Sequence, residues 1–446
     1  MGRNGQGLRI SVIGTGYLGL THAVCMADLG HEVLAIDVDA EKIAKAARGE
    51  SPFFEPGLEP LLRKNLDAGR LRFTDSFAEI GEFADVHFIC VGTPQVKDGG
   101  NADLSYVFGA AEALAPHLNR ATLIVGKSTV PVGTSRQLIE RVHAAAPAGD
   151  LVEYAFNPEF LREGYAVQDS LTPDRIVFGV TSEGAEELMR AVYATPLASG
   201  IPALTMDLET AELVKVAANS FLATKISFIN VMAEMCEASG ADVIKLADAI
   251  GIDERIGRKF LSPGLGFGGG CLPKDIRAFR ATAADRGVDS LVNLLTTVDT
   301  INLGRRDRII TLALAALGDE LQGKRIAVLG AAFKPNSDDI RDSPSLAISG
   351  RLADLGAIVA VHDPVAMPNA ARVRPDLRYA ESVHDAAQGA DLVLHLTEWT
   401  DYRTIDPEAL RSIVAHPVLI DGRCTLDGEV WRAAGWTVLV PGRPQA

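Results

Sequence analysis

The chain has 446 residues, 47% of them hydrophobic, which is enough to form several cores and excludes a single small module. Its 58 acidic and 43 basic side chains leave a net charge of −15, which would repel a polyanion such as nucleic acid. Its five cysteines, without any C-x-x-C pair, fit a reducing, cytoplasmic setting better than a disulfide framework, and no metal site is predicted.

Short apolar runs alternate with helical patterns through the first half of the chain. The runs lie at residues 8–13, 32–37, 86–91, 122–125 and 152–156. Strands separated by helices predict a parallel, doubly wound α/β sheet. Residues 10–27 carry no formal charge, but their glycines and polar side chains argue against a signal peptide or a membrane helix. No other window is expected to span a bilayer, so no membrane partner is predicted.

The sequence Gly14-Thr15-Gly16-Tyr17-Leu18-Gly19 follows the first predicted strand and opens a helix. The first glycine permits a tight turn, the second lets the backbone approach a pyrophosphate, and the third allows close helix packing. Asp37 ends the next strand, where a carboxylate accepts ribose hydroxyls and repels a 2′-phosphate, so NAD is favoured over NADP. Lys42 weakens that preference, because a cation tolerates the phosphate. Thr93 and Thr129 follow later strands and are predicted to line the nicotinamide side of the crevice.

A long helix is predicted between Asp207 and Ser239, where glycine and proline are absent and apolar residues recur at helical spacing. At ~1.5 Å per residue it would be about 50 Å long, enough to bridge two domains and form a dimer seam. Alternatively, it lies between two lobes of one monomer. Lys215 and Asn219 share one face of this helix among apolar neighbours, so they can direct a cation and an amide at one oxygen.

Two further clusters carry chemistry. Glu159 and Glu163 lie at a predicted strand-to-helix junction and suit substrate hydroxyls, activation of water, or an exposed helix start. Five glycines between residues 264 and 270 precede Cys271, Lys274 and Asp275. Glycines at that density let backbone N–H groups approach a ligand, and a neighbouring lysine can hold a cysteine as thiolate, which makes Cys271 the predicted nucleophile. Cys25, Cys90 and Cys236 are predicted to be small buried residues.

A second α/β unit follows Gly323. Its predicted strands lie at residues 324–330, 357–363, 390–396, 418–421 and 436–440, with a helix near 345–355. The turn at 330–333 lacks spaced glycines, so a Rossmann-like unit without its own dinucleotide site is expected. The tail from Pro441 is expected to fray. Three domains are predicted: a Rossmann-like domain at 1–205, a central helical dimerisation domain with the cysteine loop at 206–305, and a Rossmann-like domain at 306–446.

Six blocks resemble, in order, those of the UDP-glucose/GDP-mannose dehydrogenase family. They are GTGYLGL, KSTVPVGT, NPEFLREG with PDRIVFG, AELVKVAANSFLATKISFIN, GFGGGCLPKD and AAFKPNSDDIRDSP, and the resemblance covers about residues 8–440. It implies two Rossmann-like domains, the first binding NAD and the last a UDP-sugar, joined by a long central helix and a helical middle domain. It also implies a homodimer through that helix, with UDP-glucose oxidised to UDP-glucuronate and two NAD reduced per sugar.

The resemblance also assigns roles residue by residue. The catalytic positions are Cys271 as nucleophile, Lys215, Asn219 and Asp275 as its polar partners, and Glu159 and Thr129 around the reacting carbon and water. The NAD positions are Gly14, Gly16, Tyr17, Leu18, Gly19, Asp37, Lys42, Thr93, Thr129, Glu163 and Arg341. The substrate positions are Glu159, Phe160, Leu161, Arg162, Glu163, Lys215, Asn219, Arg255, Phe260, Leu261, Ser262, Pro263, Gly264, Gly268, Lys334 and Arg423, and Arg255 matches an arginine that reaches the neighbouring subunit's site.

The family chemistry implies a covalent route. The Cys271 thiolate would add to the aldehyde to give a thiohemiacetal, whose oxidation leaves a thioester that water cleaves. Lys215 and Asn219 would stabilise the oxygen in each tetrahedral state. The base remains open among Lys215, Asp275 and Glu159.

Three positions depart from the family pattern. Gly270 replaces a common serine, Leu272 a frequent aromatic residue, and Cys424 a usual asparagine. Because of the third departure, the family's contacts near Arg423 are not carried over to this chain. The same chemistry on GDP-mannose or a UDP-N-acetylhexosamine is the nearest alternative. A two-electron hydroxyacid dehydrogenase would not need Cys271, and a sensor without catalysis would not retain both the nucleophile and the cofactor glycines.

Overall fold

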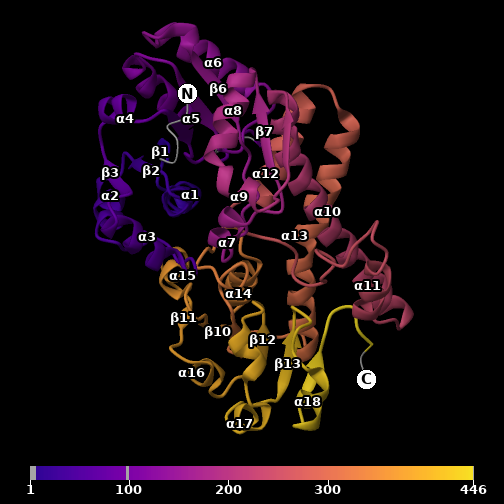
Figure 1. The fold of residues 1–446 in the computed structure, drawn as a ribbon. Coiled ribbons are helices and arrows are strands. Elements are labelled where there is room, and N and C mark those ends of the chain that lie inside the picture. The colour runs from indigo at the N-terminus through magenta and orange to yellow at the C-terminus, as the bar shows by residue number, and fades with distance from the viewer. Residues whose placement is uncertain (1–6, 97–99, 445–446) are drawn as a thin grey trace. The chain divides into compact units, whose positions relative to one another are not determined.

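The computed structural model describes residues 7–96 and 100–444. The chain divides into two compact units, residues 1–218 and 219–446, each built around its own sheet (Figure 1). The helical segment that follows residue 218 therefore belongs with the second sheet. The finer division into domains at 1–205, 206–305 and 306–446 stays a prediction.

The sheet of the first unit has the strand order β3-β2-β1-β4-β5-β6-β7-β8. Its strands are β1 Arg9–Ile13, β2 Glu32–Ile36, β3 Leu71–Thr74, β4 Val86–Ile89, β5 Thr122–Gly126, β6 Val152–Phe156, β7 Ile176–Val180 and β8 Ala203–Met206. The strands up to β6 are parallel in the Rossmann order, and β7 runs antiparallel to β6. The five predicted strands and the doubly wound fold are confirmed. The prediction omits β3, β7 and β8; in β3 (LRFT) and β8 (ALTM) polar residues interrupt the apolar ones, so neither forms a continuous apolar run.

The helices of the first unit follow its strands along the chain. They are α1 Tyr17–Asp28, α2 Ala40–Ala47, α3 Leu58–Asp67, α4 Phe77–Phe83, α5 Ser105–Leu114, α6 Thr134–Ala145, α7 Ala166–Leu171, α8 Glu183–Val192 and α9 Ala194–Ala198. Side chains cap several of them: Asp39 accepts from the first turn of α2 and Ser182 from that of α8. α1 instead begins after Gly16 without a side-chain cap, so its first N–H groups are available to an anion.

Helix α10 spans Leu208–Ser239, which confirms the predicted long helix. Among the described residues it is the one helix that is, by length and composition, long and apolar enough to cross a membrane. This finding concerns length and composition alone, so the expectation that no other window spans a bilayer stays a prediction. A core helix passes the same test, and α10 buries the polar side chains of Asn219, Ser227 and Asn230.

The second unit continues with helices α11 Val243–Gly251, α12 Leu272–Asp285 and α13 Asp289–Leu317. Its sheet has the order β11-β10-β9-β12-β13-β14 and is parallel throughout. The strands are β9 Arg325–Leu329, β10 Ile358–His362, β11 Arg378–Tyr379, β12 Leu392–His395, β13 Val418–Asp421 and β14 Thr437–Leu439, and the helices are α14 Pro344–Asp354, α15 Met367–Val373, α16 Val383–Ala387, α17 Pro407–Arg411 and α18 Gly428–Ala433. The order repeats that of the first unit, so the second Rossmann-like fold is confirmed.

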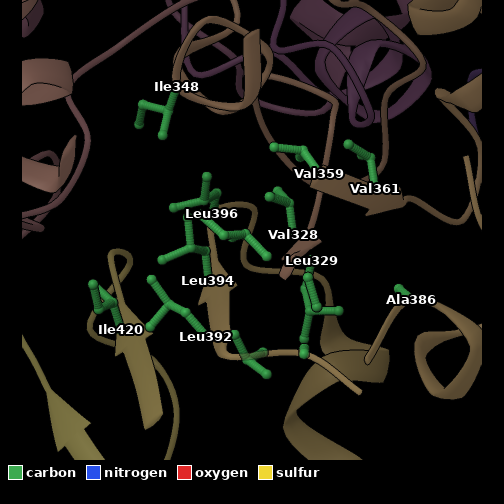
Figure 2. Close-up of a cluster of buried hydrophobic side chains, with 14 of the residues drawn as sticks. Val328, Leu329, Ile348, Val359, Val361, Ala386, Leu392, Leu394, Leu396 and Ile420 are labelled. Carbon is green, nitrogen blue, oxygen red and sulfur yellow. The ribbon is translucent and has the colours of Figure 1, made fainter. Parts of the chain in front are cut away.

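The core of the second sheet explains why its strands read as continuous apolar runs. Val328, Val359, Leu394 and Ile420 come from four neighbouring strands and lie with Ile348 of α14 in one buried cluster (Figure 2). Central strands are covered on both faces, so their side chains are apolar on both faces.

The tail is anchored rather than frayed as far as residue 443. Pro441 and Gly442 are buried, the Gly442 N–H donates to Glu237 at 2.8 Å, and its carbonyl accepts from Val243 N–H at 2.9 Å. Arg443 pairs with Asp242 at 3.3 Å. The expected fraying was wrong, because partners from α10 and α11 satisfy the tail's polar groups.

Candidate active site

The turn between β1 and α1 has the shape that a dinucleotide phosphate requires. Gly14 has φ +95°, and a Cβ on Gly19 would lie 1.8 Å from the Gly14 oxygen, so both positions require glycine for the fold itself. Gly16 is exposed, and a Cβ there would meet nothing within 4 Å. The open position lies at the uncapped start of α1, where N–H groups and the helix dipole favour an anion. The residues present therefore fit the pyrophosphate of NAD.

Asp37 is fixed beside this turn. Its Oδ2 accepts from the Thr15 N–H at 2.6 Å and the Thr15 hydroxyl at 3.0 Å, and its Oδ1 accepts from the Asp39 N–H at 3.0 Å. A carboxylate has about four acceptor sites, so one remains, on a half-buried side chain, for a ribose hydroxyl. Lys42 pairs with Asp39 at 3.4 Å.

Tyr17 anchors a neighbouring loop. Its hydroxyl donates to Glu55, whose carboxylate accepts from the N–H groups of Gly164 at 2.7 Å and Ala166 at 2.8 Å. Burial, followed by the Glu55 carboxylate, raises the pKa of the Tyr17 phenol, so it remains a donor. Tyr17 is thus occupied structurally, and its predicted cofactor contact stays a prediction, as do those of the half-buried Leu18 and the buried Thr93.

Glu159 and Lys215 form an ion pair in the first unit. The Lys215 ammonium donates to Glu159 Oε1 at 2.7 Å, and their side chains are only 11% and 4% exposed. Glu159 Oε2 accepts from the Leu161 N–H at 2.6 Å. Burial alone would raise the pKa of Glu159, but Lys215, the Leu161 N–H and Lys127 hold it below its usual value. The ion pair therefore keeps the Glu159 carboxylate charged although it is nearly buried. Thr129 lies half-buried after β5.

The loop after Glu159 is ordered by its own side chains. The Phe160 ring lies 3.7 Å from the Arg175 guanidinium carbon. Arg162 is exposed and pairs with Asp169 at 2.6 Å. Glu163 is buried, and α7 begins only at residue 166, so the alternative of an exposed helix start is wrong.

Cys271 occupies the N-cap position of α12 and is exposed. A helix N-terminus favours a thiolate. One turn inside the helix, the buried Asp275 accepts from Lys274 Nζ at 2.7 Å and from Asn219 Nδ2 at 2.6 Å. Lys215 and Asn219, one turn apart on α10, therefore each donate to a carboxylate in this structure.

The glycines before Cys271 have packing reasons that the sequence pattern did not reveal. A Cβ on Gly268 would lie 2.4 Å from the Asp342 oxygen, one on Gly270 2.2 Å from the Arg341 guanidinium, and Gly266 and Gly269 both have φ +84°. Their density is therefore explained at least as well by close approach within the protein as by a ligand.

A buried polar frame holds the start of the same loop. The Gly264 N–H donates to Asn230 Oδ1 at 2.9 Å, and its carbonyl accepts from Arg305 Nε at 3.1 Å. Arg305 is only 1% exposed and also pairs with Glu234 at 3.0 Å. Of the predicted substrate residues here, Phe260 has φ +65°, Leu261, Pro263, Gly264 and Gly268 are buried, and Ser262 is exposed.

Arg423 and Lys334 of the second unit, both predicted to bind the substrate, lie in different surroundings. Arg423 is 11% exposed, pairs with Glu398 at 3.1 Å and donates to the carbonyls of Leu396 at 2.7 Å and Phe333 at 3.0 Å, so it links the loops that follow β12 and β9. The next residue, Cys424, has φ +56°, a conformation that asparagine tolerates better. The cysteine at this position is therefore less favourable for the backbone than the asparagine usual in the family. Lys334 Nζ lies 5.4 Å from the Phe333 ring centre.

Two arginines at predicted sites are exposed. Arg341 pairs with Asp339 at 2.6 Å, and Arg255, 88% exposed, pairs with Asp253 at 2.6 Å. The described ranges contain no group of three or more His, Cys, Asp or Glu side chains that could hold a metal ion. Sequence reasoning missed Lys127, although a lysine directly after the buried run Thr122–Gly126 is an unusual signal.

Comparisons with known proteins cover the whole chain. Residues 8–197, 209–303 and 327–428 match the NAD binding, central and UDP binding domains of the UDP-glucose/GDP-mannose dehydrogenase family. UDP-glucose 6-dehydrogenase of Rhizobium meliloti (strain 1021) is 43% identical over 98% of this chain and 100% of its own length. UDP-glucose 6-dehydrogenase YwqF of Bacillus subtilis (strain 168) is 42% identical over 97% of this chain and 99% of its own.

Two solved structures have the same architecture. A UDP-glucose dehydrogenase from the archaeon Pyrobaculum islandicum superimposes with a TM-score of 0.91 at 37% identity, covering 100% of both chains. The UDP-D-ManNAc dehydrogenase of Pyrococcus horikoshii gives a TM-score of 0.85 at 25% identity, covering 98% of this chain and 100% of that one.

Proposed function

Because the chain belongs to the UDP-glucose/GDP-mannose dehydrogenase family, we propose that it oxidises UDP-glucose to UDP-glucuronate and reduces two NAD per sugar. The observation that carries the proposal is the 43% identity to a UDP-glucose 6-dehydrogenase over 98% of this chain. The enzyme is an NAD-dependent oxidoreductase, and the open Gly16 position at the uncapped start of α1 supports that cofactor.

The predicted site residues take separate roles in the two oxidations. NAD, when bound, accepts the hydride in each oxidation. The alcohol proton leaves to a base as the first hydride leaves carbon 6, giving an aldehyde. The Cys271 thiolate then adds to the aldehyde carbon, and Lys215 and Asn219 hold the resulting oxygen. Loss of the second hydride gives a thioester on Cys271.

Hydrolysis closes the cycle. Water attacks the thioester carbon, the carbon–sulfur bond breaks, and the acid leaves with Cys271 restored. We assign activation of this water to Glu159, which is held ionised beside Lys215. Lys334, Arg341 and Arg423 supply positive charge to the sugar nucleotide and the cofactor, which an acidic protein needs in order to bind anions. The five thiols support our placing the enzyme in the cytoplasm.

The proposal includes a homodimer through α10. Phe221, Phe228 and Met235 recur every seven residues on this helix and are 66%, 48% and 61% exposed. Apolar residues at that period form one stripe, which a second copy of the helix would cover. Arg255, exposed in one copy, is then the residue that we assign to the partner's site.

One assay tests the substrate and the number of electrons together. The purified enzyme is incubated with NAD and, in parallel, UDP-glucose, GDP-mannose and UDP-N-acetylhexosamines, and NADH is counted per sugar consumed. We expect two NADH from UDP-glucose. One NADH per sugar would replace the proposal with a two-electron reaction, and two NADH from another sugar only would reassign the substrate. No NADH with any of them would favour a sensor.

A further inference from the structure

Lys127 is a buried lysine that the reaction scheme above does not use. It follows β5 directly and is only 6% exposed. Lysine is almost never buried to this degree unless it is paired. Its position therefore requires a reason beyond packing.

The ammonium is held by neutral groups. Lys127 Nζ donates to Asn157 Oδ1 at 2.8 Å and to the Tyr193 hydroxyl at 3.3 Å, and the Tyr193 hydroxyl donates to Asn157 Oδ1 at 2.6 Å. The Asn157 amide nitrogen donates to the Val177 carbonyl at 2.9 Å, which fixes the oxygen toward the lysine. All four residues are buried, so the network has one arrangement.

The network joins two loops at the end of the sheet. Lys127 begins the loop after β5, which carries Thr129 two residues later, and Asn157 begins the loop after β6, which carries Glu159 two residues later. The backbone supports the same junction, because the Asn157 N–H donates to the Gly126 carbonyl at 2.8 Å. The Lys127 side chain therefore ties the segment that presents Glu159 to the one that presents Thr129.

The charge of Lys127 also acts on the Glu159 carboxylate. Its ionisable neighbours are Glu159 and Cys90, which raise the pKa of Lys127, and Lys215, which lowers it. The Lys127 charge lowers the pKa of the buried His22, and burial raises the pKa of the Tyr193 phenol, which stays neutral beside the ammonium. Burial lowers the pKa of Lys127 to about 8, so the ammonium predominates at neutral pH. Its field adds to that of Lys215 in lowering the pKa of Glu159.

We propose that Lys127 is a positioning residue that sets Glu159 for the hydrolytic step, by tethering the Asn157 loop and by keeping the Glu159 carboxylate ionised. This inference rests on the proposed function, because it assigns Glu159 to the water that cleaves the thioester. It predicts a defect in hydrolysis, with the oxidations and the binding of both substrates spared.

Two variants of Lys127 separate the tether from the charge. Lys127→Met removes both at similar side-chain length, whereas Lys127→Gln keeps an amide donor for Asn157 without the charge. Tyr193→Phe is the matched control, because it removes the two hydrogen bonds of the Tyr193 hydroxyl and leaves the Lys127 charge and its bond to Asn157. Circular dichroism and thermal melting establish that each variant is folded before kinetics are compared.

The readout is pre-steady-state NADH formation with UDP-glucose. In Lys127→Met we expect a burst of about two NADH per site, followed by a steady state roughly 10- to 100-fold slower than wild type, because the thioester accumulates. Because binding and the oxidations precede hydrolysis, kcat/KM for UDP-glucose and for NAD should stay within about 2-fold, and KM should fall together with kcat. Lys127→Gln should recover part of the steady-state rate.

The pH profile tests the charge. Removing the ammonium raises the pKa of Glu159, so the acid limb of kcat should move to higher pH in both Lys127 variants, by roughly 0.5 to 1, and stay in place in Tyr193→Phe. A folded Lys127→Met enzyme with wild-type kcat and acid limb would overturn the inference, as would a slowed burst. If wild-type enzyme gives no NADH from UDP-glucose, the proposed function itself fails instead.

Discussion

Asp37 and Asp363 hold the same position in the two sheets, one residue after the second strand, and each accepts from the turn that follows the first strand. Asp37 Oδ2 accepts from the Thr15 N–H at 2.6 Å, and Asp363 Oδ2 from the Ala331 N–H at 2.7 Å. Asp363 also accepts from Trp399 Nε1 at 3.1 Å and is 0% exposed, whereas Asp37 is half-buried. The second unit thus uses for its fold the carboxylate that the first keeps accessible to a ribose.

The first prediction concerns cofactor choice. Asp37→Ala should raise the dissociation constant for NADH by about 10- to 100-fold, because a charged acceptor for the ribose hydroxyls is lost. Affinity for NADPH should fall less, since the repulsion of the 2′-phosphate is lost too. Fluorescence titration with each nucleotide measures this, with Asp39→Asn, which keeps the helix cap, as control. Equal losses of affinity for both nucleotides would show that Asp37 does not bind the ribose.

The second prediction is that Asp363→Ala affects the fold rather than the cofactor. The Asp363 carboxylate also accepts from the N–H groups of Ala332, Val365 and Ala366, so its removal leaves several buried donors unpaired. We expect a loss of roughly 3 kcal/mol or more in the free energy of unfolding. Urea unfolding followed by circular dichroism measures it. A stable variant with weakened NADH binding would contradict the structural role.

The third prediction tests the covalent route. Cys271→Ala should lower UDP-glucuronate formation by at least about 1,000-fold, because no thioester can form. Binding of NADH and UDP-glucose, measured by calorimetry, should stay within about 3-fold of wild type, since the thiol is not an anion-binding group. Cys236→Ala, which alters a buried thiol on α10, is the control. Undiminished acid production by Cys271→Ala would exclude the thioester.

The fourth prediction concerns assembly. Phe228→Glu should convert the dimer to a monomer at micromolar concentration, because a charge in the centre of an apolar seam is costly to bury. Light scattering measures the mass. Val430→Glu is the matched control, since Val430 is 51% exposed on α18 and Phe228 48% on α10. A wild-type enzyme that is an active monomer would end the proposal of a dimer.

The sequence by itself determined the elements whose signals are local. Buried runs on both faces predicted the central strands, the Gly14–Gly19 turn predicted the dinucleotide fold, and unbroken helical spacing predicted α10. The motif blocks identified the family and the candidate catalytic, cofactor and substrate positions. Each of these signals lies within one element or one turn, so neighbouring residues suffice to reveal it.

Only the tertiary structure decided which side chains meet. Lys127 reaches Asn157 across 30 positions, Arg305 reaches Gly264 across 41, and Gly442 reaches Glu237 across 205. Such partners are chosen by the packing of whole elements, which periodicity and propensity along the chain do not encode. The same reason hides the function of the glycines before Cys271, because the groups that require them, Asp342 and Arg341, are brought there by the fold.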